Sequence, residues 1–204
     1  MMTPAAVATK KIRKFRLHAR PSAVLRNLKV LLDNAQDTPE LASDIETEAK
    51  AAQARLDPAA LYVTVTPGGT PSALDAFWAP APGEPAPVAL TVFAATIGGG
   101  LEAELAGALS RGETFRGRVL TALGEELADQ AATFVERLVG EEARADACEL
   151  LERRPCADDA AHRAVLDFLD AGRVGIGQDP GGHRFPRFTR VGVIPWGPPS
   201  KKKK

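Results

Sequence analysis

The chain has 204 residues, with 26 lysines and arginines against 26 aspartates and glutamates, so its formal net charge is zero. A neutral chain lacks the positive field that draws nucleic acid or anionic lipid to a protein surface, which argues against either as a general partner. The length suits one domain, and the apolar fraction of 45% contains 36 alanines and few aromatic residues. We therefore expect a helix-rich domain with a core of small side chains.

Cysteine and histidine are scarce. Cys148 and Cys156 are too few for a disulfide framework, and none of the three histidines lies at metal-ligand spacing from a cysteine or another histidine, so we predict no metal site. No window holds the roughly 18 consecutive apolar residues of a membrane span, and the N-terminus lacks the apolar core of a secretion signal. These features predict a cytoplasmic protein with reduced cysteines and no membrane segment.

Both ends of the chain are basic. Residues 1–20 form a basic N-terminal arm, in which six lysines and arginines lie between Lys10 and Arg20. The arm is either a solvated approach to the first helix or a contact for a phosphate backbone or an acidic partner. The domain itself is expected to span residues 21–197, and residues 198–204 form a Lys-rich tail that we predict to be disordered.

Apolar residues at spacings of three and four predict helices, and alternating or continuous β-branched runs predict strands. The elements predicted in chain order are helices over 22–34 and 39–56, a strand over 61–66, a proline-rich surface loop over 67–87 with residues 74–78 held on the core, a buried strand over 88–97, helices over 101–110, 118–149 and 158–169, and short strands over 174–176 and 191–194. Thr38 is the expected N-cap of the second helix, and Gly172 is the expected stop of the last. This order favours a single α+β domain with a mixed sheet packed with helices.

Three successive glycines turn the buried strand into the next helix. Backbone N–H groups at a helix N-terminus can bind a phosphate where no Cβ stands in the way. Together with Ala103, Gly98 and Gly100 match a loose form of the dinucleotide-binding fingerprint, although two helices and a strand precede the turn. Two interpretations stay open: a nucleotide site at Gly98, Gly99 and Gly100, or glycines that only terminate a strand.

Few residues could act as a nucleophile or a base. Cys156 lies beside Arg153 and Arg154, which could lower the pKa of its thiol, but no base is close to it in sequence. His183 lies on a glycine-rich loop with no evident carboxylate to orient it, and His162 lies in a predicted helix. No motif of a hydrolase or a kinase is present, so the sequence predicts no catalytic residue.

Several segments nevertheless resemble the activation domain of cobalamin-dependent methionine synthase. The run Ala23-Val24-Leu25-Arg26-Asn27-Leu28 resembles the family's opening "VLRYLG" helix, and Ala95-Thr96-Ile97-Gly98 with Leu101-Glu102 resembles its "TLG…LE" step from strand to helix. Residues 165–176 are similar to its "LFxLLDAERIGV" segment, and residues 187–194 stand in the place of its last strand. The matches span residues 22–196 in the family's order.

This resemblance implies a bent, antiparallel-rich sheet in a single α+β domain. In the family, the domain presents S-adenosylmethionine to a corrinoid during reductive reactivation, docked on a cobalamin-binding module. The family's ligand-binding "RxSPGY" segment is represented here only by Arg153-Arg154-Pro155-Cys156, and the one tyrosine, Tyr62, lies elsewhere. The resemblance thus implies that Arg153 or Arg154 could hold the ligand's carboxylate, at a site that is otherwise degenerate.

Three functional hypotheses follow. The first is a non-catalytic accessory protein that binds a corrinoid protein or methyltransferase, with cobalamin held only by that partner, because the chain lacks the Asp-x-His-x-x-Gly motif of many corrinoid proteins. The second is a small nucleotide- or S-adenosylmethionine-dependent enzyme that uses Gly98, Gly99 and Gly100. The third is a nucleic-acid-associated protein whose basic arm makes the contacts.

Overall fold

The computed structural model describes residues 8–32, 38–156, 158–179 and 181–198. Its main sheet is antiparallel, with strands in the order β1, β2, β3, β8 and β4, and with β5 also paired to β8. The strands are β1 Lys10–Arg13, β2 Ala59–Val65, β3 Ala89–Thr96, β4 Glu149–Leu150, β5 Arg154–Pro155 and β8 Thr189–Gly197. This sheet confirms the predicted α+β class and its antiparallel-rich form. The sheet also includes part of the basic N-terminal arm, because Lys10–Arg13 of that arm form the edge strand β1.

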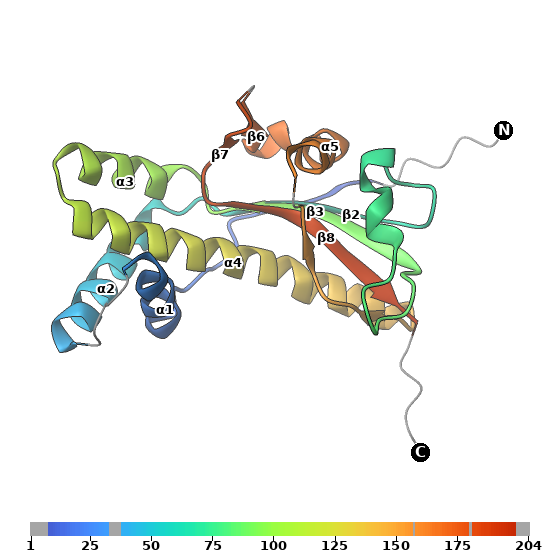
Figure 1. Cartoon of the computed structure of the whole chain (residues 1–204), viewed down its shortest axis with the longest axis horizontal. Helices are drawn as coiled ribbons and strands as arrows, with labels where there is room; N and C mark the ends of the chain where they lie inside the picture. The colour runs from blue at the N-terminus through green and yellow to red at the C-terminus, as the bar shows by residue number, and fades with distance from the viewer. Residues whose placement is uncertain (1–7, 33–37, 157, 180, 199–204) are drawn as a thin grey trace, which may run out of the picture.

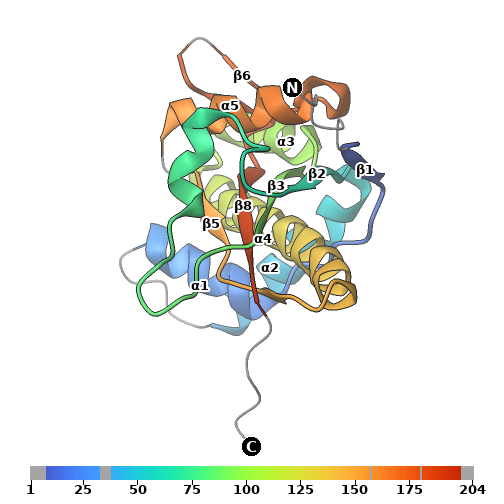
Figure 2. The ribbon, with the colours of Figure 1, turned by 90° about the vertical axis from the view of Figure 1, so that its right-hand side faces the viewer.

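Helices cover both faces of the sheet (Figures 1 and 2). The helices are α1 Pro21–Leu31, α2 Pro39–Ala52, α3 Gly100–Ser110, α4 Thr114–Ala145 and α5 Asp159–Leu169, with 3-10 turns η1 Gln53–Arg55, η2 Ser72–Trp78 and η3 Ala171–Val174. The long helix α4 crosses one face, and α1, α2 and α3 pack against it. The other face carries α5, η2, η3 and a small hairpin of β6 (Gly177–Gln178) and β7 (Arg184–Phe185).

Alternation along the strands produces a separate core on each face. On β2, Ala60 and Tyr62 belong to the core beneath α4, whereas Leu61 and Val63 belong to the core beneath α5. Every residue of β3 is buried, which explains why its sequence is a continuous apolar run. The buried face of α4 is rich in alanine, so the helix can approach the sheet closely.

Local signals explain several helix ends. The Thr38 hydroxyl accepts a hydrogen bond from the Leu41 N–H at 3.2 Å, which confirms the predicted N-cap of α2. The Asp158 carboxylate caps α5 in the same way, by accepting from the Ala161 N–H at 2.7 Å. The predicted stop of α5 at Gly172 is wrong: the helix ends at Leu169, the C-cap Asp170 adopts a left-handed φ of 50°, and Gly172 lies in η3.

Other differences from the sequence predictions lie in the second half of the chain. α4 begins before the predicted residue 118. It also ends before the predicted residue 149, because residues 149–150 pair with β8 as β4. The strand predicted over 174–176 does not form: Val174 ends η3, and Gly175 and Ile176 connect η3 to β6. The predicted end of the first helix near Asn34 and residues 199–204 of the predicted tail lie outside the described residues. Across the described ranges, no helix combines the length and apolarity needed to span a membrane.

Candidate functional site

The two arginines predicted as ligand residues lie at the edge of the sheet, where the chain passes from β4 to β5. Arg154 pairs in register with Val193 of β8, whose side chain belongs to the core beneath α5. Successive residues of a strand point to opposite faces, so Arg154 points toward η2 and α5, and Arg153 points toward α4. The structure thus gives the two neighbouring arginines different partners.

Arg154 holds the proline-rich loop. Its Nη1 donates to the carbonyl oxygens of Phe77 at 3.2 Å and Ala79 at 2.7 Å, and its Nη2 donates to Glu84 Oε2 at 2.7 Å. The hydrogen bond from Arg154 is the main reason that the pKa of Glu84 is lowered. Both terminal nitrogens of Arg154 are therefore already used by the protein itself.

This arrangement predicts that Arg154→Ala releases the loop. The side chain is 18% exposed and its charge-assisted hydrogen bonds join three backbone or side-chain acceptors, so we expect the free energy of unfolding to fall by about 2 kcal/mol. Urea denaturation measures that loss, and limited proteolysis should cut residues 79–84 faster than in the unmodified chain. Arg163→Ala, at an exposed position on α5, is the control. Unchanged proteolysis in Arg154→Ala would show that the loop is held by other contacts.

Arg153, in contrast, is incompletely paired. Its Nη1 lies 3.6 Å from Glu136 Oε2 on α4, which is an ion pair but is too long for a hydrogen bond. The same nitrogen is shielded from solvent and has no hydrogen-bond partner among the described residues. A buried donor without an acceptor costs free energy, and a bound carboxylate would supply that acceptor.

Glu136 also lines a cleft of about 490 Å³ between α4 and the segment that leads into β4. The lining residues are Thr133, Glu136, Arg137, Gly140 and Arg144 of α4, with Cys148, Glu149 and Leu150 opposite. A volume of this size falls within the range of small-molecule sites, roughly 300 to 1,000 Å³. Arg153 is not one of these lining residues and borders the cleft only through its ion pair with Glu136. A guanidinium beside a carboxylate matches the carboxylate and ammonium groups of an α-amino acid, so this cleft is the candidate functional site.

A second ion cluster holds α4 against β8. The Arg190 guanidinium donates to Asp129 Oδ1 at 2.7 Å and to Glu125 Oε2 at 2.6 Å. Asp129 and Glu136 lie two helical turns apart on α4. Because the cluster ties α4 to β8 at Asp129, it also helps to fix the position of Glu136 relative to the sheet. The sequence predictions included neither Arg190 nor Glu136.

The three glycines lie where β3 passes into α3, against the connection between η1 and β2. A Cβ on Gly100 would stand 2.3 Å from the carbonyl oxygen of Arg55, and Gly98 has a φ of +83° beside Asp57. Dinucleotide-binding turns occur in parallel βαβ units, whereas the strands here are antiparallel. Chain packing gives Gly98 and Gly100 a structural role, and a nucleotide site at Gly98, Gly99 and Gly100 stays a prediction.

Burial shifts the pKa of Cys156 and the pKa of His162 away from the values that a nucleophile or a base needs near neutral pH. Burial, with Asp158 nearby, raises the pKa of the Cys156 thiol to about 12, so the expectation of a lowered pKa is wrong. Burial lowers the pKa of His162 to about 4. His183 does have a carboxylate partner, since its Nδ1 lies 3.2 Å from Asp179 Oδ2, but it is solvent-exposed. No cluster of three or more potential metal ligands exists within the described ranges.

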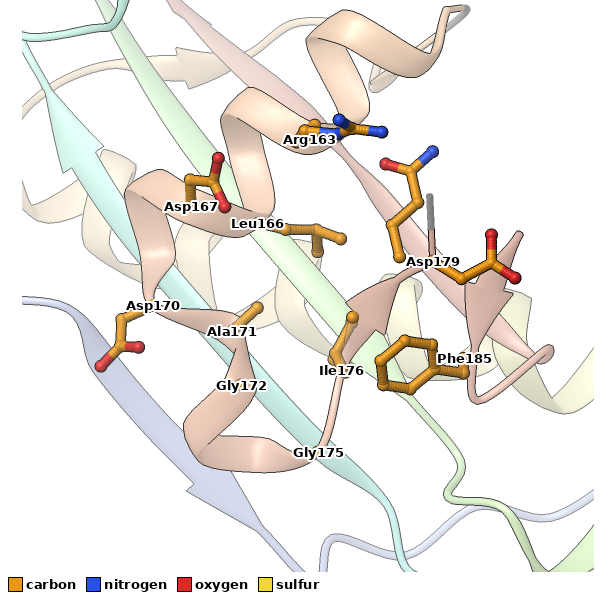
Figure 3. A pocket seen from close by; sticks show the side chains of 12 residues that line it. Arg163, Leu166, Asp167, Asp170, Ala171, Gly172, Gly175, Ile176, Asp179 and Phe185 are labelled. Atoms are coloured by element: carbon orange, nitrogen blue, oxygen red, sulfur yellow. The ribbon is translucent and has the colours of Figure 1, made fainter. Parts of the chain in front are cut away.

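A cavity of about 630 Å³ lies on the other face of the sheet, between α5, η3 and the hairpin (Figure 3). Leu166, Ala171 and Ile176 form its apolar part, near the exposed ring of Phe185. The carboxylates of Asp170 and Asp179 lie at opposite ends and do not converge on one point. The cavity contains none of the residues that the sequence predicts as ligands.

The elements and their order define an α+β domain with one antiparallel sheet between a long helix and a shorter one. This fold is similar to the crystal structure of the MetH reactivation domain bound to AdoHcy (S-adenosylhomocysteine), with a TM-score of 0.61 and 13% sequence identity. The similarity covers 96% of this chain and 80% of that chain. It confirms the resemblance seen in the sequence at the level of the fold. No protein-family profile and no curated protein sequence matches the chain.

Proposed function

We propose that the chain is an accessory protein resembling the methionine synthase activation domain, which assists reactivation of a corrinoid-dependent methyltransferase. In this proposal the chain keeps a degenerate site for an S-adenosyl ligand in the cleft between α4 and β4. The observation that carries the proposal is the buried, unbonded Nη1 of Arg153 beside Glu136. The fold shared with a domain that binds AdoHcy supports the choice of ligand.

Each charged group has a defined task in this proposal. Arg153 binds the carboxylate of the ligand, and Glu136 binds its ammonium group, with the rest of the ligand along the cleft toward Leu150. S-adenosylmethionine and AdoHcy carry the same amino-acid group, so both are candidate ligands. The corrinoid protein or methyltransferase holds the cobalamin and carries out the chemistry, and this chain supplies binding rather than catalysis.

Calorimetric titration with AdoHcy tests the ligand site. Arg153→Met should weaken binding by roughly tenfold to a hundredfold, because a hydrogen bond to a charged group is worth about 1.5–3 kcal/mol. Arg163→Met, an exposed change on α5, is the matched control and should bind like the unmodified chain. Equal binding by Arg153→Met and the unmodified chain would contradict the site.

The same titration distinguishes the proposed accessory protein from the alternative, an enzyme that binds its ligand at the glycine turn. Gly99 is the suitable glycine to change because a Cβ there meets nothing within 4 Å. Under our proposal Gly99→Asp binds AdoHcy normally. Loss of AdoHcy or NAD binding in Gly99→Asp alone would favour a nucleotide- or S-adenosylmethionine-dependent enzyme that uses the glycine turn.

The partner half of the proposal is tested by analytical ultracentrifugation. The full chain is mixed with the corrinoid-loaded cobalamin-binding module of a methionine synthase, and the absorbance of the corrinoid reports its sedimentation. We expect the corrinoid band to sediment faster in the mixture than alone. Sedimentation as two independent species at micromolar concentrations would contradict an accessory role toward that enzyme.

A further inference from the structure

A second cleft, of about 330 Å³, lies between α4 and the basic N-terminal arm. The proposed function does not use this cleft. Its charged and polar lining consists of Arg16, His18 and Arg20 from that arm, with Gln130, Thr133 and Arg137 from α4. The described residues that line this cleft include no carboxylate. A space bordered by three guanidinium groups and an imidazole favours an anion.

The basic segment is fixed in place beside α4. Phe15 and Leu17 are buried, and the ring of Phe15 stacks on Phe134 with centroids 4.2 Å apart. Gln130 clamps the backbone of His18, because its Oε1 accepts from the His18 N–H at 3.2 Å and its Nε2 donates to the His18 carbonyl at 2.6 Å. Because the buried residues Phe15 and Leu17 alternate with Arg16 and His18, the cationic side chains point outward from a backbone that Gln130 holds in place.

Positive charge in this cleft exceeds the negative charge that the protein supplies. The buried carboxylate of Glu126 accepts from Arg20 Nε at 2.7 Å, so it offsets one arginine. Arg137 lies over the ring of Phe134, 5.4 Å from its centroid, in a cation–π contact that restrains it. In the described structure, Arg16 and Arg137 have no carboxylate partner.

We propose that this cleft binds a compact phosphate-bearing small molecule. Arginine forks match phosphate oxygens in bidentate geometry, and a volume of about 330 Å³ admits a phosphate monoester or a pyrophosphate group. Phe15 stacks on the ring of Phe134 and the Arg137 guanidinium lies over that ring, so both contacts compete with a base that would stack there. This competition favours a small anion over single-stranded nucleic acid, which uses exposed aromatic rings.

Titration of the full chain with pyrophosphate at low ionic strength tests the proposal. Arg16 lines this cleft and not the S-adenosyl cleft, whereas Arg137 lines both. Arg16→Gln should weaken pyrophosphate binding roughly tenfold, because one charge-assisted pair is lost. Arg163→Gln on α5 is the matched control and should bind pyrophosphate as the unmodified chain does. Circular dichroism checks that each variant is folded.

Two cross-titrations keep the two proposals distinguishable. Arg16→Gln should bind AdoHcy normally, and Arg153→Met should bind pyrophosphate normally. Absence of saturable pyrophosphate binding at millimolar concentration, or equal weakening in Arg16→Gln and Arg163→Gln, would overturn the site. Tighter binding of a single-stranded oligonucleotide than of pyrophosphate, lost in Arg16→Gln, would overturn the small-molecule assignment in favour of nucleic acid.

Discussion

Replacing Gly100 with alanine should lower the free energy of unfolding by about 3 kcal/mol, the upper part of the range for overpacked sites. The new Cβ would stand 2.3 Å from the carbonyl oxygen of Arg55, and that oxygen belongs to the backbone rather than to a flexible side chain. The Asp57 N–H donates to the Ile97 carbonyl at 3.0 Å, which ties the two segments together and limits their separation. Urea denaturation at neutral pH measures the loss.

Gly99→Ala is the matched control for this prediction. Gly99 has a φ of −88°, which alanine adopts freely, and a Cβ there meets nothing within 4 Å. We expect a change below about 1 kcal/mol, as for ordinary surface substitutions. If Gly100→Ala were as stable as Gly99→Ala, close packing could not be the reason for glycine at position 100.

The stability of the protein should also fall by about 3 kcal/mol as the pH drops from 6.5 to 4, because His162 is buried in its neutral form. Burial, aided by Arg184, lowers the pKa of His162 from 6.5 to about 4 in the folded protein. Between these two pH values the unfolded chain binds a proton at this histidine and the folded chain does not. The contribution is therefore complete above pH 6.5 and lost as the pH falls to about 4.

Comparison of urea unfolding across this pH range isolates the contribution of His162. In His162→Leu the slope of stability against pH should be smaller than in the unmodified chain, whatever the effect of the substitution at neutral pH. His183→Gln is the control, because the His183 side chain is 84% exposed. Parallel pH profiles for His162→Leu and the unmodified chain would contradict a buried neutral His162.

Patterned segments of the fold could be predicted from the sequence. The apolar run of β3 and the Thr38-Pro39 start of α2 each carry a strong local signal, and the structure confirms both. The two-residue strands β4 and β5 carry no such pattern, since they exist only through their pairing with β8. Residues 174–176 have the composition of a strand, but the left-handed backbone at Asp170 and Gly175 turns the chain instead.

The candidate site was predicted only in part, for a similar reason. The resemblance named Arg153 or Arg154 as the residue that could hold the ligand's carboxylate, and the register of β5 against β8 is what gives the two arginines different partners. Glu136 was missed because its contact with Arg153 depends on how α4 lies against the sheet edge. No local motif could have signalled that contact, since a half-buried glutamate in a long helix usually belongs to a solvated face.

A crystal structure of the full chain with AdoHcy tests the proposed S-adenosyl site most directly. We expect the amino-acid group of the ligand to lie between Arg153 and Glu136, with its carboxylate on the Arg153 nitrogen that lacks a hydrogen bond in the described structure. Density for AdoHcy at the glycine turn or in the cavity beside α5 would contradict this site. So would the absence of any bound ligand at a saturating concentration of AdoHcy.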